Sequence, residues 1–436
     1  MATPIIELKS VGKSFRSADG TSRSVLEGVD FTLNEGEIVA LLGQSGSGKS
    51  TMLRIMAGLI AADRGQVQYR GLPLYGPAHA ISMVFQSFAL FPWLTVQKNV
   101  ELGLEAKGMP PADRARRAEA AIELIGLSGF EGALPRELSG GMRQRVGIAR
   151  ALVLEPEVLL MDEAFSALDV LTGERLRDEI LELWQTKQLP TKAILVVSHN
   201  IEEAVMMADR VLIFASDPGR VRDELPVTLA RPREVESSEV RALIDNVYGL
   251  MTAGAGRPGR VTEKEVKLQL GDRLPEADIA RMDGILELLV DEPFLGHADL
   301  PKLAEETELT DQELLNVSRA LTLMGFAHLD QGDIIITPLG EQYVHANTPE
   351  RQVIFGQQLI ENVPLVAYIH HGLKQDPSGD LHEDLFLRLL RFTLNEEEAI
   401  SALRVAIEWG RYGDLFEYNF NTGIIQIPKN KETVAE

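Results

Sequence analysis

The sequence feature that most constrains the fold is a glycine-rich loop between a short apolar run and a helical pattern. The loop is Gly43-Gln44-Ser45-Gly46-Ser47-Gly48-Lys49-Ser50-Thr51, which follows the apolar residues 38–42. Its glycines let backbone N–H groups turn toward phosphate oxygens, the helix start adds a positive dipole end, and Lys49 supplies a charge. We therefore predict a phosphate site, with the Ser50 hydroxyl as a ligand of Mg²⁺. The other interpretation is a glycine-rich turn with an exposed lysine.

Short β-branched runs alternate with helical patterns through the first 230 residues. The apolar runs cover residues 38–42, 158–161, 193–197 and 211–214. Such alternation predicts an α/β domain with a mostly parallel sheet. A phosphate loop on that sheet fits kinases, GTPases and many ATPases, so other motifs must decide the class.

Two carboxylates follow the apolar run over residues 158–161. Asp162 leaves the predicted strand first and can join the Mg²⁺ coordination shell, and Glu163 is then placed to orient and polarise an attacking water. The alternative is an acidic pair that caps the next helix. That alternative does not explain a carboxylate pair at the carboxyl end of a buried strand, where α/β proteins bind their ligands.

A second anion site is predicted at residues 138–145, Leu-Ser-Gly-Gly-Met-Arg-Gln-Arg. Ser139 can cap a helix that continues to residue 154, and Gly140 and Gly141 leave the backbone N–H groups at its start uncovered. One chain then carries two phosphate-binding helix starts about 90 residues apart.

These motifs, taken in this order with Asp162 and Glu163, resemble the ATP-binding-cassette ATPases over residues 5–225. In that family the Ser-Gly-Gly segment of one subunit closes on nucleotide held by the phosphate loop of another. The resemblance therefore implies ATP and Mg²⁺ as cofactors and a second ATPase subunit, identical or paralogous, as a partner.

The resemblance also assigns roles to four other residues. Phe15 matches the aromatic residue that stacks on adenine, and Gln86 matches the glutamine that touches Mg²⁺ on the γ-phosphate side. Asp169 lies in the loop that crosses the dimer interface, and His199 matches the histidine that senses the γ-phosphate. A lone phenylalanine or strand-end histidine is also common in a protein core.

One position departs from the family pattern. Ala164 stands where a proline usually follows the catalytic glutamate. Because alanine can adopt the φ angle that proline enforces, we expect a slightly more mobile loop and retained activity.

Three segments favour an importer subtype. Residues 91–96, 142–145 and 167–172 resemble the ATPases of taurine, aliphatic sulfonate, nitrate and bicarbonate importers. This resemblance implies transmembrane permease partners, an upstream solute-binding protein and a peripheral location on the inner face of the bacterial membrane. We expect Pro92 and Trp93 to be exposed beside Gln86 where a permease helix could dock, although they could also belong to the local core.

Charge and composition divide the chain. We assign residues 1–235 to the ATP-binding domain, 236–270 to a bridging helix and Gly/Pro linker, and 271–436 to an acidic C-terminal α+β domain. Of the net charge of −22, about −4 belongs to residues 1–235 and −18 to the rest. An acidic half repels phosphate backbones, so we expect no nucleic-acid partner. The chain has no cysteine and no long apolar run, and we expect a cytoplasmic protein.

The acidic part contains a possible internal repeat. Capping boxes at residues 310–313 and 395–398 are 85 residues apart, and Arg319 and Arg404 match at the same offset. A possible hairpin follows each predicted helix, which gives the element order of a winged helix. The first such helix carries a single arginine, Arg319, on its exposed side, whereas a helix that binds in a DNA groove needs a basic surface.

This region resembles the C-terminal AAA-associated domain appended to some importer ATPases, for which a regulatory or dimer-stabilising role is implied. The alternative function is a nucleotide-dependent regulator whose winged-helix-like domain binds a partner.

Overall fold

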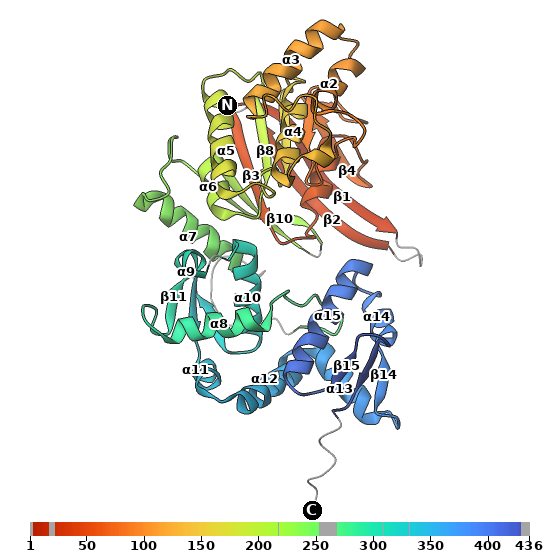
Figure 1. Ribbon diagram of the computed structural model, residues 1–436, viewed down its shortest axis with the longest axis vertical. Coiled ribbons are helices and arrows are strands. Elements are labelled where there is room, and N and C mark those ends of the chain that lie inside the picture. The colour runs from red at the N-terminus through yellow and green to blue at the C-terminus, as the bar shows by residue number, and fades with distance from the viewer. Residues whose placement is uncertain are drawn as a thin grey trace, which may run out of the picture. The chain divides into compact units, whose positions relative to one another are not determined.

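The computed structural model describes residues 3–16, 22–216, 218–252, 268–307, 309–330 and 332–428. Contacts divide the chain into two compact units, the first ending at Ile244 and the second beginning at Asp245 (Figure 1). The predicted bridging helix is α7 (Ser238–Thr252), and the predicted Gly/Pro linker falls mostly outside the described residues.

Two sheets form the framework of the first unit. The strands of the smaller sheet lie in the order β2 (Ser22–Asn34), β1 (Pro4–Arg16), β4 (Arg64–Tyr69) and β5 (Leu72–Pro73), and all its neighbours are antiparallel. The larger sheet has the order β10 (Arg220–Pro226), β9 (Arg210–Ala215), β3 (Glu37–Gly43), β8 (Ala193–Val197), β7 (Val158–Asp162) and β6 (Ile81–Val84). Only β10 pairs antiparallel in the larger sheet, which confirms the predicted α/β domain with a mostly parallel sheet.

Helices and the smaller sheet bury the central strands of the larger sheet on both faces. Alternate residues of β3 enter different clusters: Ile38 lies in one apolar core, and Val39 lies in the other. Strands buried on both faces read as continuous apolar runs, which explains the pattern in the sequence. The helices are α1 (Lys49–Met56), α2 (Val96–Ala106), α3 (Pro111–Leu124), α4 (Gly140–Leu152), α5 (Val170–Gln185) and α6 (Ile201–Met207), with a 3₁₀ turn at Pro135–Glu137.

The second unit contains two successive segments with the same element order. The first segment, repeat 1, is α8 (Ile279–Val290), β11 (His297–Asp299), α9 (Leu300–Thr307), α10 (Asp311–Leu323), β12 (Ala327–Asp330) and β13 (Asp333–Ile336). The second segment, repeat 2, is α13 (Pro364–Gln375), β14 (Asp380–His382), α14 (Asp384–Leu390), α15 (Glu396–Tyr412), β15 (Glu417–Asn419) and β16 (Ile424–Gln426). Each three-stranded sheet places its last strand between the other two. The helices α11 (Pro338–His345) and α12 (Thr348–Asn362) connect the repeats.

A partly buried polar cluster joins the two repeats. The Tyr343 hydroxyl of α11 donates a 2.8 Å hydrogen bond to Asp283 of α8 and lies 2.8 Å from the hydroxyl of Tyr412 on α15. Burial raises the pKa of Asp283. Trp409 of α15 is fully buried and its indole N–H donates to the carbonyl of Ala277. These contacts make the repeats parts of one folded unit.

None of the helices among the described residues has both the length and the apolar character needed to span a membrane.

Candidate functional site

The predicted phosphate loop joins β3 to α1 and depends on glycine for its shape. Gly46 and Gly48 adopt left-handed φ angles of 73° and 99°. A Cβ atom at Gly48 would approach the side chain of Leu26 to 2.8 Å, and one at Gly43 would come within 2.6 Å of the carbonyl oxygen of Phe214. The spacing of glycines in the motif is therefore required by both conformation and close packing.

Lys49 begins α1 and is 5% exposed. Its ammonium group donates hydrogen bonds of 2.7 and 2.8 Å to the carbonyl oxygens of Gly43 and Gln44. Burial lowers the pKa of Lys49 to about 8, although the carboxylates of Glu163 and Asp162 oppose that shift. The lysine is thus buried at the phosphate loop rather than exposed on a turn.

Ser50 and Asp162 form a pair of oxygen ligands next to the loop. The Ser50 hydroxyl donates a 2.9 Å hydrogen bond to the Asp162 carboxylate at the end of β7. Asp162 is 1% exposed, and burial raises its pKa while the bond from Ser50 opposes the shift. Oxygen ligands suit Mg²⁺, and a buried carboxylate gains from a nearby cation, so these residues fit the ion.

Gln86, Glu163 and His199 converge from the ends of three neighbouring parallel strands, β6, β7 and β8. The amide of Gln86 donates a 2.8 Å hydrogen bond to Oε2 of Glu163, and Nδ1 of His199 lies 3.8 Å from the same oxygen. Glu163 has a left-handed φ of 49°, and its N–H donates to the carbonyl of Val197. Such strain in a residue other than glycine costs about 1–3 kcal/mol and is concentrated at functional sites.

Three other predicted positions lie apart from this group. Phe15 is 46% exposed, with the ammonium of Lys13 5.5 Å from its ring centroid, so it is not a core residue. Ser139 caps α4, which begins at Gly140-Gly141, by accepting a 3.2 Å hydrogen bond from the N–H of Met142. Asp169 is exposed and caps α5. Within the described ranges, no hydrogen bond or ion pair joins Phe15, Ser139 or Asp169 to Lys49 or Glu163.

The loop after Gln86 is supported by α4, a contact that the sequence analysis missed. Phe88 and Ala89 have left-handed φ angles of 59° and 48°. The guanidinium of Arg150 donates to the carbonyls of both residues at 2.9 and 2.5 Å, and that of Arg143 lies 5.4 Å from the Phe88 ring centroid. The seven-residue spacing of the two arginines on one helix was the available signal.

The next residues present two aromatic rings to solvent. Asn99, which is fully buried, accepts a 2.8 Å hydrogen bond from the N–H of Phe91 and donates to the carbonyls of Phe91 and Leu94. Phe91 and Trp93 are 38% and 71% exposed, and their ring centroids are 5.4 Å apart. Trp93 is therefore exposed as predicted, and the local-core interpretation is wrong.

Glu203 is a second residue that the sequence analysis missed. It lies four residues after His199, and burial raises its pKa to about 7. A hydrogen bond with Ser198 and the charge of Arg177 oppose the shift, while the charge of Glu163 adds to it. The negative charge of Glu163 thus adds to the effect of burial on the pKa of Glu203. Helical spacing from His199 was the only sequence signal for this position.

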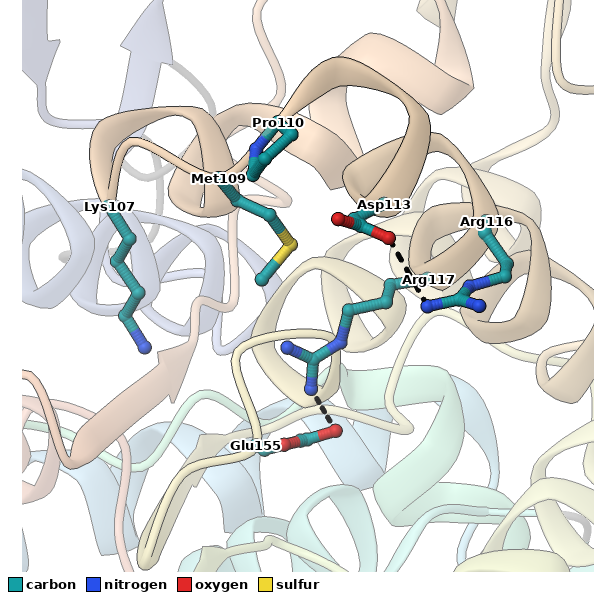
Figure 2. A pocket seen from close by; sticks show the side chains of 7 residues that line it. All are labelled: Lys107, Met109, Pro110, Asp113, Arg116, Arg117 and Glu155. Carbon is teal, nitrogen blue, oxygen red and sulfur yellow. Dashed lines mark hydrogen bonds and ion pairs between the residues drawn. The ribbon is translucent and has the colours of Figure 1, made fainter.

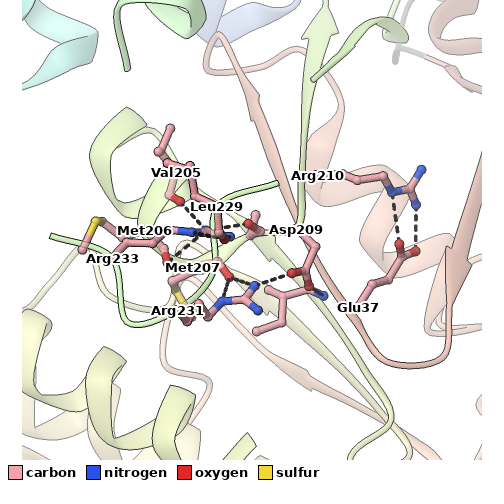
Figure 3. Close-up of polar contacts among 11 residues, drawn as sticks. Glu37, Val205, Met206, Met207, Asp209, Arg210, Leu229, Arg231 and Arg233 are labelled. Carbon is pink, nitrogen blue, oxygen red and sulfur yellow. Dashed lines mark hydrogen bonds and ion pairs between the residues drawn. The ribbon is translucent and has the colours of Figure 1, made fainter. Parts of the chain in front are cut away.

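The short helix α6 is fixed at both ends. The side chain of Asn200 caps its start. At its end, the guanidinium of Arg233 donates to the carbonyls of Val205 and Ala208, at 2.6 and 2.7 Å (Figure 3). Arg231 is paired with Asp209 at 2.9 Å. Helix C-termini leave carbonyls unsatisfied, and these arginines satisfy them.

A surface pocket of about 570 Å³ lies elsewhere in the first unit (Figure 2). Ion pairs between Arg117 and Glu155 and between Arg116 and Asp113 cross it. Its lining residues are Lys107, Met109, Pro110, Asp113, Arg116, Arg117 and Glu155. None of them belongs to the phosphate loop or to the Glu163 group, so the pocket is not part of that site.

Comparison with known proteins identifies two family regions. Residues 26–166 match the ABC transporter family, and residues 301–419 match the C-terminal AAA-associated domain. A solved dimeric ATP-binding cassette bound to ADP and phosphate is 33% identical and aligns with a TM-score of 0.48, covering 52% of this chain and all of that one.

Curated relatives match only about half of this chain but most of their own length. A nitrate import ATP-binding protein of Synechocystis sp. is 42% identical over 229 residues, covering 52% of this chain and 85% of the relative. A taurine import ATP-binding protein of Shigella boydii is 42% identical over 49% of this chain and 83% of the relative. An aliphatic sulfonates import ATP-binding protein of Bacillus subtilis is 40% identical, covering 52% of this chain and 88% of the relative. The chain therefore belongs to the ABC transporter ATP-binding family, as a transport ATPase related to nitrate, taurine and sulfonate importers with a C-terminal AAA-associated domain.

Proposed function

We propose that this chain energises a bacterial importer of a small oxyanion or sulfonate as one of two ATPase subunits that share two ATP sites. The observation that carries the proposal is the Glu163 carboxylate, held by Gln86 beside His199 at the strand ends next to the phosphate loop. The names of the curated relatives support the class of cargo.

In the proposed mechanism the phosphate loop and Lys49 hold the β- and γ-phosphates. Ser50, Asp162 and Gln86 would hold Mg²⁺, which when bound neutralises charge on the phosphates. Glu163 accepts a proton from the attacking water, and His199 and Gln86 position that carboxylate and water.

The remaining predicted residues complete the shared site. Phe15 stacks on the adenine ring, and its exposure on β1 supports this role. Ser139, Gly140 and Gly141 of one subunit present the start of α4 to the nucleotide of the other, and Asp169 lies at that interface.

We assign the permease contact to Phe91 and Trp93 as part of this proposal. The exposure of both rings, the hydrogen bonds between Asn99 and Phe91, and the hydrogen bonds from Arg150 to Phe88 and Ala89 support a rigid apolar surface in the loop after Gln86. A force on this surface reaches the Glu163 group through the loop that Gln86 begins. The subunit would then lie against the inner face of the membrane, with a solute-binding protein upstream of the permease.

The C-terminal unit is proposed to regulate the ATPase through two winged-helix-like repeats. Binding of nucleic acid through α10 is disfavoured because α7 already contacts one face of this helix. The Tyr248 hydroxyl of α7 donates to the Asp311 carboxylate, and Arg319 donates a 3.1 Å hydrogen bond to the carbonyl of Met251. The helix α10 carries acidic residues and contacts α7 at both ends, so it lacks the basic surface that binding in a DNA groove requires. A regulator with a macromolecular output is the competing function, and copurification with DNA rather than with a permease would favour it.

The substitution Glu163→Gln tests the catalytic assignment. We expect ATP to bind with nearly unchanged affinity while kcat falls by about 10²–10⁴-fold, because an amide cannot accept the proton from water. The measurements are steady-state phosphate release and equilibrium nucleotide binding. Glu182→Gln makes the same chemical change on the exposed side of α5 and should leave both values unchanged. Hydrolysis by Glu163→Gln at the rate of the unmodified protein would remove Glu163 from this role.

A cargo assay complements this test. Binding of nitrate, taurine and bicarbonate by the solute-binding protein that works with this ATPase would identify the transported class. Copurification of the full chain with permease subunits is the expected result for an importer.

A further inference from the structure

The two repeats of the C-terminal unit contain equivalent helices, α10 and α15. Each begins with a complete capping box, Thr310 with Glu313 and Asn395 with Glu398, at an offset of 85 residues. At that offset Leu315 corresponds to Ile400, and Arg319 corresponds to Arg404. Equivalent positions in the two repeats can therefore be compared directly.

In repeat 1 α7 contacts both ends of one face of α10. Asp311, Leu315 and Arg319 lie on this face because they are four residues apart. Tyr248 and Met251 of α7 bind its two ends, through the Asp311 carboxylate and the Arg319 guanidinium. Leu315, between these ends, is 1% exposed.

In repeat 2 the residues that the structure describes leave the equivalent face of α15 exposed. Ile400 is 48% exposed, and Glu397 and Arg404 beside it are also exposed. The helix α12 packs against α15 through the ring of Phe355, which contacts Trp409 and Tyr412. Trp409 lies nine residues after Ile400 and hence on the opposite side of the helix, so α12 does not occupy the face next to Ile400.

We propose that this open face of α15 binds the same face of a second copy of the chain, with the two helices antiparallel about a two-fold axis next to Ile400. An axis between residues 400 and 401 places Glu397 and Arg404 about 5 Å on either side along the helix. Glu397 of each copy then faces Arg404 of the other, and the two Ile400 side chains meet at the centre. The contact is self-complementary in both charge and apolar surface.

The charges favour a second copy over an unrelated helix. A strongly basic or acidic partner would meet a like charge at either Arg404 or Glu397, whereas an antiparallel copy pairs both. Without such pairing, the acidic C-terminal units would repel each other. Phe392, 79% exposed in the turn before α15, adds apolar surface at one end of the face. This pairing needs no nucleotide, which separates it from the ATP-dependent pairing of the proposed function.

Charge reversal tests the pairing in the full chain without nucleotide. In sedimentation velocity we expect the unmodified protein to dimerise, and Glu397→Arg or Arg404→Glu to weaken the dimer about tenfold or more, because each puts like charges together twice. The double variant exchanges the two charges and should restore the dimer. Glu361→Arg, on the exposed surface of α12, is the matched control and should change nothing. A monomeric unmodified protein, or a double variant no better than the single ones, would overturn the proposal.

A crosslinking test does not depend on the stability of the charge variants. The chain contains no cysteine, so Ile400→Cys introduces the only thiol. Under mild oxidation without nucleotide we expect a disulfide-linked dimer, because the two thiols face each other across the axis. Glu361→Cys should remain monomeric on a non-reducing gel. Equal crosslinking of the two variants would mean random collision and would contradict the pairing.

Discussion

At the scale of single residues, Lys49 links nucleotide binding to pH. Burial lowers the pKa of Lys49 to about 8 in the free protein, and bound phosphate groups favour its charged form. Nucleotide binding should therefore take up a proton above pH 8, and affinity should fall as pH rises through the pKa of the free lysine. We expect a loss of about tenfold between pH 7 and pH 9.

Titration calorimetry in buffers of different ionisation enthalpy measures this proton uptake directly. Lys49→Arg keeps a positive charge at every pH in that window and should flatten the profile, even where its affinity is lower. A pH profile unchanged by that substitution would assign the proton to another group.

Glu203 gives the second prediction at this scale. Its pKa is raised to about 7 in the folded protein, so the unfolded chain loses this proton at a lower pH than the folded one does. The contribution of Glu203 to stability is therefore most favourable at acidic pH and declines as pH rises toward 7. Glu203→Gln, which cannot ionise, should raise Tm at pH 8 and change it little at pH 4.

Thermal unfolding at several pH values checks this sign. Glu182→Gln, the same change at an exposed position of α5, is the control, and its effect on Tm at pH 8 should be smaller than that of Glu203→Gln. A Tm difference that shrinks toward pH 8 would show that the Glu203 carboxyl is stabilised as its anion.

At the scale of elements, the arginines after β10 hold the end of the helix that follows His199. Arg233 is 8% exposed and donates to carbonyls of α6 and of Leu229 (Figure 3). Arg233→Ala leaves those carbonyls buried without donors and should lower the free energy of unfolding by about 2–4 kcal/mol.

Urea unfolding followed by circular dichroism measures the loss. The matched control is Arg241→Ala, which removes an exposed arginine from α7 and should cost less than about 0.5 kcal/mol. We also expect slower ATP hydrolysis by Arg233→Ala, because a loosened α6 no longer fixes His199. Equal stability of the two variants would contradict the role of Arg233 at this helix end.

Local patterns predicted local structure well. The phosphate loop, the strand ending at Asp162 and the two capping boxes each depend on residues within a few positions, and all are present in the structure. Contacts between distant residues could not be predicted in this way. Arg150 reaches a loop 61 residues away, and the pKa of Glu203 depends on burial by elements separated along the chain. In each case the sequence held only a spacing along one helix, and such a spacing does not identify the distant partner.

At the scale of the whole molecule, the residues proposed for the chemistry lie in the first unit, and the proposed regulation belongs to the second unit. Every residue proposed to hold ATP or to act in hydrolysis precedes residue 204, within the first unit. A chain that ends at Ile244 should therefore bind ATP and hydrolyse it at a basal rate. Its stimulation by permease should differ from that of the full chain if the second unit regulates.

The comparison is between the full chain and the shortened one, each with and without reconstituted permease. Collapse of nucleotide affinity in a folded shortened chain would mean that the second unit contributes to the site. Unchanged basal and stimulated rates would remove its regulatory role.

The position of the unit boundary inside α7 also affects how the ATPase unit can be isolated. Val247, Tyr248 and Met251 are all buried, and they lie on the half of α7 that belongs to the second unit. A chain cut at the natural end of the helix, Thr252, keeps these side chains but loses α10, which Tyr248 and Met251 contact. Apolar side chains left in solvent promote aggregation. Poor solubility of such a fragment would therefore reflect the exposed second half of α7 rather than a misfolded nucleotide site.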